Sequence, residues 1–361
     1  MFRLRLSHVV SIAPGPVVLD TPYPTQNAIF LGDKKTVIQL DRKTLKPIRR
    51  VKTKLQVRGG FGSVVLLYYY DEFQAWNENG QLLWSRKVQS QPARRDDRLY
   101  LLDAGLVVLD LASGSVLDRF ANCPSGFPSL LDDGVLVADP ERTDPVRLYG
   151  FAERRVLWEK SLLEEIRDRF QVNDRHPTLS FAGGSVGRVV MERGRHLFGM
   201  SVPSGDFLWA IPLHISYFVP QIRDARIYAW TTGPGASSTR VTMDLGSGQA
   251  IRERSEPAAG DNHFVIVDEV SGEIVVDRPL AAYGAAFEHF QEPYRGTLCK
   301  NHIVFTTRSG LIAVFRLSDG ELVWQHQHGD QLFYPVFEDN LLYVTCADGT
   351  LVVFEAEGGE L

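Results

Sequence analysis

Short apolar runs alternate along this chain with turns rich in Asp, Ser and Gly. The clearest example has an apolar run over 311–315, a turn that ends at Gly320, and a second apolar run that ends at Trp324. Weaker copies span 106–117 and 196–209. An apolar run, a tight turn and a second apolar run together predict a β-hairpin. Because the hairpin recurs along the chain, we expect a repeat architecture built from small β-sheets.

Eight copies of this phrase can be aligned by one position each. Most neighbouring copies are about 34 to 50 residues apart, which is the spacing of four-stranded propeller blades. A ninth phrase, at 265–276, follows the sixth copy too soon to be a full blade, so we interpret it as an inserted hairpin. The aligned positions are Asp41, Trp76, Asp110, Phe151, Met200, Asp244, Phe315 and Phe354.

The last copy predicts three strands, at 334–337, 341–345 and 350–354, and no fourth. At the other end of the chain, Phe2–Leu6 alternates apolar and charged residues with a period of two, which predicts a spare strand. We expect residues 2–6 to pair with Thr350–Phe354 and to close the ring, since closure removes an exposed sheet edge.

Charge agrees with that closure. The first 60 residues are strongly basic, whereas no Lys or Arg follows Arg316. Closure of the ring would bring these two parts together. We therefore expect Arg3 and Arg5 to lie near Glu355 and Glu357.

Composition adds three bounds. The 361 residues are 44% hydrophobic and 23% charged, as in ordinary globular proteins, and their net charge of −5 argues against general affinity for nucleic acid. No apolar run approaches the length of a membrane span, and no signal peptide is visible. The cysteines, Cys123, Cys299 and Cys346, are isolated, which is typical of a reducing compartment. We therefore expect a cytoplasmic protein without membrane insertion that is a monomer in isolation.

The phrases 318–324 and 79–84 resemble the repeat of PQQ-like β-propellers, in which a Gly-containing turn is followed by a Trp on the outer strand. Trp84, Trp158, Trp209 and Trp324 match that Trp position. The resemblance covers nearly the whole chain and implies an all-β fold: a single propeller over 1–361 with eight four-stranded blades, or alternatively seven. Members of the family include quinoprotein dehydrogenases, a lipoprotein of barrel assembly and cytoplasmic scaffolds.

The activity of the quinoprotein enzymes does not carry over with the resemblance. Those enzymes have a disulfide of adjacent cysteines, and this chain has no adjacent cysteines. The sequence also holds no familiar catalytic motif. His326 and His328 would face the same side of a strand, but spacing identifies no third metal ligand. We therefore expect no cofactor, no bound metal and no enzymatic activity.

Three segments stand out from the repeat. The stretch Arg42–Arg58 is basic, and we interpret it as a solvated edge strand; the alternative is contact with an acidic partner. A helical insertion is predicted at 161–177, where Ser161 and Glu164 form a capping box. A hairpin and helix insertion is predicted at 253–295.

These insertions suggest where a partner binds, since long loops carry function disproportionately. We expect a protein-binding scaffold whose partner docks on the two insertions and the neighbouring loop 231–239. One specific form is an immunity or antitoxin-like protein that blocks a bacterial toxin. The alternative is a small-ligand-binding or enzymatic propeller that uses the axial channel. The predicted partner-binding residues are Phe170, Arg175, Tyr283, Phe287, Phe290, Tyr294 and Arg295.

Overall fold

The computed structural model describes most of the chain. The described residues are 2–12, 21–33, 35–88, 93–102, 105–123, 127–131, 133–138, 145–161, 179–183, 187–193, 196–213, 221–231, 239–243, 250–254, 263–283, 296–307, 309–329 and 331–357. They form two compact units. Unit 1 comprises Met1–Val88, Asp110–Ser115 and His289–Leu361, and unit 2 comprises Gln89–Leu109 and Val116–Glu288.

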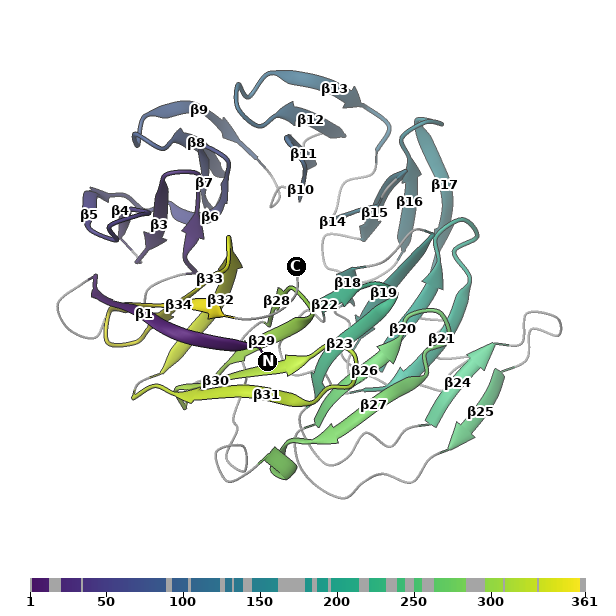
Figure 1. The fold of residues 1–361 in the computed structure, drawn as a ribbon. Coiled ribbons are helices and arrows are strands. Elements are labelled where there is room, and N and C mark those ends of the chain that lie inside the picture. Colours follow the sequence, from purple (N-terminus) through teal and green to yellow (C-terminus); the bar gives the residue numbers. More distant parts are fainter. Residues whose placement is uncertain are drawn as a thin grey trace. The chain divides into compact units, whose positions relative to one another are not determined.

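Unit 1 contains four antiparallel sheets of four strands each within the described residues (Figure 1). Blade one is β2 (Tyr23–Pro24), β3 (Ala28–Gly32), β4 (Thr36–Asp41) and β5 (Pro47–Lys52). Blade two is β6 (Gln56–Phe61), β7 (Val64–Tyr69), β8 (Glu72–Asn77) and β9 (Leu82–Lys87). Blade seven is β28 (Thr297–Cys299), β29 (His302–Thr306), β30 (Leu311–Arg316) and β31 (Leu322–Gln327). Blade eight is β32 (Leu332–Glu338), β33 (Leu341–Cys346), β34 (Thr350–Glu357) and β1 (Arg3–Ser11).

The strands of unit 2 belong to four further sheets. Blade three is β10 (Ala93–Arg95), β11 (Arg98–Leu102), β12 (Leu106–Asp110) and β13 (Val116–Phe120). Blade four is β14 (Phe127–Leu130), β15 (Gly134–Ala138), β16 (Val146–Gly150) and β17 (Arg155–Lys160). Blade five begins with β18 (Leu179–Gly183), β19 (Arg188–Arg193), β20 (His196–Ser201) and β21 (Phe207–Pro212). Blade six is β22 (Gln221–Arg223), β23 (Arg226–Thr231), β26 (His263–Asp268) and β27 (Ile274–Pro279), followed by the 3-10 helix η1 (Leu280–Tyr283).

The predicted all-β class with eight blades is confirmed. The central strands are continuous apolar runs because both of their faces are covered by side chains. All five residues of β3 are buried, for example. The outer strands alternate between exposed and half-buried residues, as β17 does. This contrast is expected for a strand with one face on the core and one in water.

The predicted fourth strand of the last blade is confirmed. β1 pairs antiparallel with β34, although it is longer than expected, so that Arg3 is opposite Glu357 and Ser11 is opposite Thr350. Residues 2–6 therefore lie beside the end of β34 rather than beside Thr350–Phe354 as a whole. Arg5 forms the expected salt bridges, with Glu355 at 2.5 Å and Glu357 at 2.6 Å.

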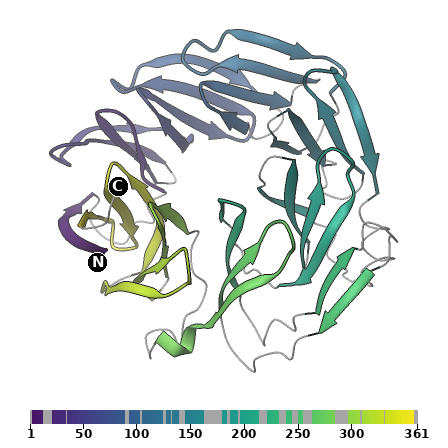
Figure 2. The ribbon, with the colours of Figure 1, turned by 45° about the vertical axis from the view of Figure 1, so that its right-hand side comes forward.

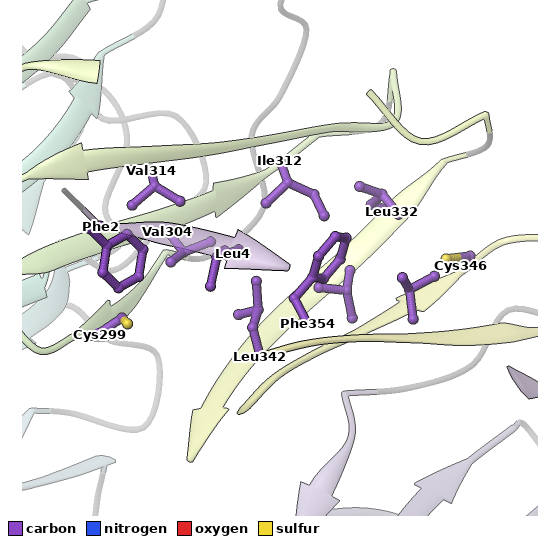
Figure 3. Close-up of a cluster of buried hydrophobic side chains, with 12 residues drawn as sticks. Phe2, Leu4, Cys299, Val304, Ile312, Val314, Leu332, Leu342, Cys346 and Phe354 are labelled. Carbon is purple, nitrogen blue, oxygen red and sulfur yellow. The ribbon is translucent and has the colours of Figure 1, made fainter. Parts of the chain in front are cut away.

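Apolar contacts fix β1 more firmly than these exposed charges. Phe2 and Leu4 are each 5% exposed and pack into the core cluster that blades seven and eight share. Figure 3 shows both side chains among Val304, Leu342 and Phe354. The closing strand is thus part of the core of unit 1.

The assignment of the sixth blade from the sequence is wrong. The phrase 265–276, interpreted above as an inserted hairpin, supplies β26 and β27, the third and fourth strands of blade six. The strands that flank Asp244 are the extra hairpin instead. They are β24 (Thr239–Met243) and β25 (Ala250–Arg254), which add to the edge of blade five and make it a six-stranded sheet (Figures 1 and 2).

The strand register explains why β26–β27, and not β24–β25, completes blade six. β23 pairs with β26 over six residues, from Arg226 opposite Asp268 to Thr231 opposite His263. β24 pairs with β21 at only two positions, Trp209 with Thr242 and Ala210 with Val241. Blade six is therefore complete without the β24–β25 hairpin.

Candidate interaction surfaces

Most of the predicted partner-binding residues lie outside the described residues. These are Phe170, Arg175, Phe287, Phe290, Tyr294 and Arg295, together with the predicted helix 162–177 and the loop 232–238. Tyr283 is described: it ends η1 and is half-buried. The structure therefore does not test whether these side chains come together.

The repeated tryptophans have a structural arrangement. Trp84, Trp158 and Trp209 each donate an indole hydrogen bond to a backbone carbonyl in the turn between the third and fourth strands of another blade, at Leu111, Val202 and Glu269 respectively. The bond from Trp209 to Glu269 skips the β24–β25 hairpin. This hydrogen bond independently identifies β26–β27 as the regular part of blade six.

Each of these indoles also covers a glycine in the same turn. A Cβ atom on Gly114 would lie 2.5 Å from Trp84, and one on Gly272 would lie 2.6 Å from Trp209. Both glycines have positive φ, 66° and 69°, which residues with a side chain adopt at a cost. The indole and the glycine therefore form one recurring contact, here called the Trp–Gly contact.

An ion pair replaces this contact between blades three and four. Asp118 occupies the Trp position on β13, and Arg154, with φ of 54°, occupies the glycine position. Arg154 donates to the Asp118 carboxylate at 2.7 Å and lies 4.6 Å from the centroid of the Phe120 ring. The hydrogen bond from Arg154 holds the pKa of Asp118 below its usual value.

The basic stretch Arg42–Arg58 includes the outer strand of blade one, as expected. On β5, Arg49, Arg50 and Lys52 are exposed. Arg42 differs from the rest of the stretch. Its side chain is only 12% exposed, and it donates to the Thr25 carbonyl at 2.5 Å and to Asp339 at 2.8 Å.

Turns near β5 engage two acidic groups in hydrogen bonds, Asp41 of blade one and Glu78 of blade two. The carboxylate of Asp41 accepts hydrogen bonds from the backbone of Lys43 and from Thr44, which hold its pKa below the usual value. Glu78 accepts from the backbone and side-chain amides of Asn27. The exposed cations of β5 are consequently not neutralised by these neighbouring acids.

His326 is on β31 and His328 follows that strand, and their rings lie near each other. The His326 ring stacks on Trp324 at 5.9 Å and lies 6.4 Å from His328. Burial, and after it the neighbouring His328, lowers the pKa of His326. Among the described residues, no group of three or more His, Cys, Asp or Glu side chains is arranged to hold a metal ion.

Comparisons with known proteins were made at the levels of sequence and structure. No protein-family model matches the chain, and no curated protein matches its sequence. Solved structures do match. The computationally designed Ika8 protein has a TM-score of 0.64 at 16% identity, covering 98% of this chain and all of the designed chain.

BamB from Moraxella catarrhalis, a β-propeller of PQQ-like repeats, matches with a TM-score of 0.53 at 12% identity and covers 99% of both chains. The fold is a β-propeller. At these identities the similarity shows the fold alone, so it supports the resemblance to PQQ-like propellers without showing an activity.

No helix among the described residues is both long enough and apolar enough to cross a bilayer.

Sequence reasoning missed two features of these surfaces. The Asp118–Arg154 pair could have been found, because both residues depart from the Trp and Gly of the repeat at matching positions. The extra hairpin is harder to find, since the sequence has the same Asp-x-x-Ser-Gly pattern at 244–248 and at 268–272.

Proposed function

We propose that this protein is a non-enzymatic scaffold that binds another protein through the side of the propeller that carries its insertions. In this proposal it is a monomer on its own and acts in the cytoplasm of a bacterial cell. The fold similarity to BamB supports the β-propeller scaffold on which this proposal builds. A fold hosts many functions, however, so the argument depends on what is added to the blades.

The β24–β25 hairpin is the observation that carries this proposal. Four strands complete each blade, and blade six closes across the insertion because Thr231 is already opposite His263. The hairpin instead extends blade five to six strands and presents β25 as a new sheet edge. A segment that the scaffold does not need, placed on its surface, is where binding function is most often found. An exposed strand edge can also pair with a segment of another chain.

Excision of the hairpin tests the proposal. Residues 232–262 are replaced by Asn-Gly, which favours the two-residue turn needed between the paired residues Thr231 and His263. We expect the shortened protein to keep a cooperative unfolding transition and to lose its partner in affinity purification. The full chain should recover one protein in stoichiometric amount. If the shortened protein binds that partner as well as the full chain does, the insertions are not the binding side.

A second measurement separates this function from the use of a small ligand. A metabolite library is screened for compounds that raise the melting temperature of the purified protein. A saturable ligand, together with the absence of any stoichiometric protein partner, would reject the scaffold role.

The more specific form of the proposal is that the partner is a bacterial toxin whose active site the scaffold blocks. A rigid β-propeller suits this role, since it holds its loops with little ordering cost on binding. The test is to express the product of the neighbouring gene alone and together with this protein. Growth arrest that co-expression relieves would support the toxin, and unaffected growth in both cultures would reject it.

A further inference from the structure

One turn of unit 1 presents an aromatic side chain in an unfavourable backbone conformation. Tyr70, in the turn between β7 and β8, has φ of 52°, in the left-handed region that disfavours non-glycine residues. Leu45 has a similar φ of 57°, but it is only 4% exposed, so burial offsets the cost. Tyr70 is 74% exposed and gains no such burial. Local strain without compensation within the chain suggests a contact outside it.

Tyr70 has an aromatic neighbour in the same turn. Its ring meets that of Tyr69 edge to face, with a centroid distance of 4.5 Å, and Tyr69 is 39% exposed. Tyrosine is among the residues that contribute most to protein interfaces, because it buries a large area at low entropic cost. The pair therefore has the composition of an interface anchor.

Three lysines lie at the same end of blades one and two as this pair. Thr53 donates its N–H to the Lys35 carbonyl at 2.9 Å, which places the β3–β4 turn beside the exit of β5. Gln56 is opposite Tyr68, so Lys54, two residues earlier, lies at the end of the sheet where Tyr70 follows. Lys35, Lys52 and Lys54 are all exposed.

The three lysines are free to bind an anion. Within the described residues, their ammonium groups take part in no salt bridge or hydrogen bond. Of the nearby acids, Asp33 accepts the N–H of Lys35, and Asp71 lies 4.0 Å from Lys87. The surface formed by Lys35, Lys52, Lys54, Tyr69 and Tyr70 is here called the blade-end patch.

We propose that the blade-end patch binds an acidic segment of the partner protein, with Tyr70 as the side chain that becomes buried. The proposal rests on the protein-binding function proposed above and adds a second contact, on unit 1. Asp71, 69% exposed, and Glu72 flank the tyrosines and would repel an evenly charged polyphosphate chain. A protein segment can place its carboxylates over the lysines and an apolar side chain over Tyr70, so a protein suits the patch better than nucleic acid.

Photo-crosslinking in the native cell tests this contact. Tyr70 is replaced by p-benzoylphenylalanine in the full chain, and in a second sample Tyr283 is replaced in the same way to probe the insertion side. We expect position 70 to crosslink to one protein, through a peptide with more Asp and Glu than Lys and Arg. Lys52→Glu with Lys54→Glu should lower the yield at least fivefold. The matched control is Lys43→Glu with Lys46→Glu, which changes the net charge equally and should leave the yield unchanged.

The possible outcomes separate the patch from the function. A crosslink to nucleic acid, a crosslinked peptide without acidic excess, or an unchanged yield after charge reversal at Lys52 and Lys54 would overturn the patch. A crosslink at position 283 but none at position 70 would overturn the patch and leave the scaffold function standing. No crosslink at either position would count against both.

Binding by the purified proteins gives a second readout. Asn accepts a left-handed conformation more readily than Tyr, so Tyr70→Asn should leave the melting temperature unchanged or raise it. The same variant should weaken the Kd for the crosslinked partner at least tenfold in calorimetry. A lowered melting temperature with an unchanged Kd would make Tyr70 a structural residue and refute the proposal.

Discussion

Trp209 is fully buried, whereas Trp84 and Trp158 are half-buried, although all three donate the same kind of hydrogen bond. The difference lies in the surroundings. Trp209 packs among Val190, Ile211 and Val265 in a core cluster of unit 2. The same residue of the repeat can therefore contribute very different amounts to stability.

Trp209→Ala should accordingly destabilise the protein by about 3–5 kcal/mol, the usual cost of removing a buried tryptophan. Trp158→Ala should cost less, since part of that indole already faces water. Urea denaturation monitored by circular dichroism measures both. Equal losses of stability would show that the deeper burial of Trp209 contributes nothing beyond the hydrogen bond that each tryptophan makes.

The Asp118–Arg154 pair can be used to test whether an ion pair and the Trp–Gly contact are interchangeable at one position of the repeat. Asp118→Trp alone places an indole against the Arg154 side chain, and Arg154→Gly alone leaves Asp118 without its hydrogen bond. The double variant recreates the Trp–Gly contact. We expect it to be more stable than the sum of the single effects predicts, with a coupling of about 1 kcal/mol or more. Additive effects within about 0.3 kcal/mol would mean that the two contacts are not equivalent.

Glu192, on β19, lies in an environment that predicts a pH dependence of stability. Burial raises the pKa of its carboxyl to about 7. Because this value is above the unfolded one, the folded state favours the protonated acid. Stability from this group is present in full below the unfolded pKa and declines as pH rises through 7. Glu192→Gln should therefore raise the melting temperature at pH 8, with a gain in the free energy of unfolding on the order of 2–3 kcal/mol. At pH 4 the substitution should change the melting temperature little. An equal effect at both pH values would contradict the raised pKa of Glu192 as the cause.

At the scale of elements, β1 shows that a strand can be predicted while its register is not. The alternation over residues 2–6 predicts the strand, and the missing fourth strand predicts its partner. The register depends on which apolar residues reach the core. Phe2 and Leu4 do so in a register that also places Ser11 opposite Thr350, and the alternation over residues 2–6 does not indicate that extension.

Deletion of residues 1–8 should lower the melting temperature sharply, since it removes both buried side chains and leaves an edge of β34 unpaired. Differential scanning calorimetry measures the change. Arg5→Ala is the control, because that side chain is 61% exposed and its loss should matter little. An unchanged melting temperature after the deletion would show that β1 does not support blade eight.

The two hairpins between β23 and η1 show where sequence patterns stop being sufficient. In both, an Asp-x-x-Ser-Gly sequence stands between two strands, so the local signal is the same. Only the long-range pairing with β23, and the hydrogen bond from Trp209 to Glu269, select β26–β27 for blade six. Pairing of this kind depends on sequence-distant partners, which periodicity does not report.

For the whole molecule, the fold follows from the sequence far better than the binding side does. The blade pattern recurs eight times in the sequence, so each copy supports the others. The family resemblance, based on residues that include Trp84, Trp158 and Trp209, also agrees with the structural similarity to BamB. The predicted binding residues depart from the repeat, so no second copy supports them. Tyr70 could not be singled out from the sequence either, because its importance rests on a backbone angle.

The pairing of β1 with β34 has a consequence for the order of events during synthesis. Arg5 is synthesised 350 positions before its strand partner Glu355. During synthesis β1 must therefore wait, unpaired and with Phe2 and Leu4 exposed, until β34 has been made. A contact closed across such a distance forms late, because its loop entropy is large. A product that stops before Thr350 therefore has no strand on which β1 can close, and its Phe2 and Leu4 lack the core contacts that blade eight provides.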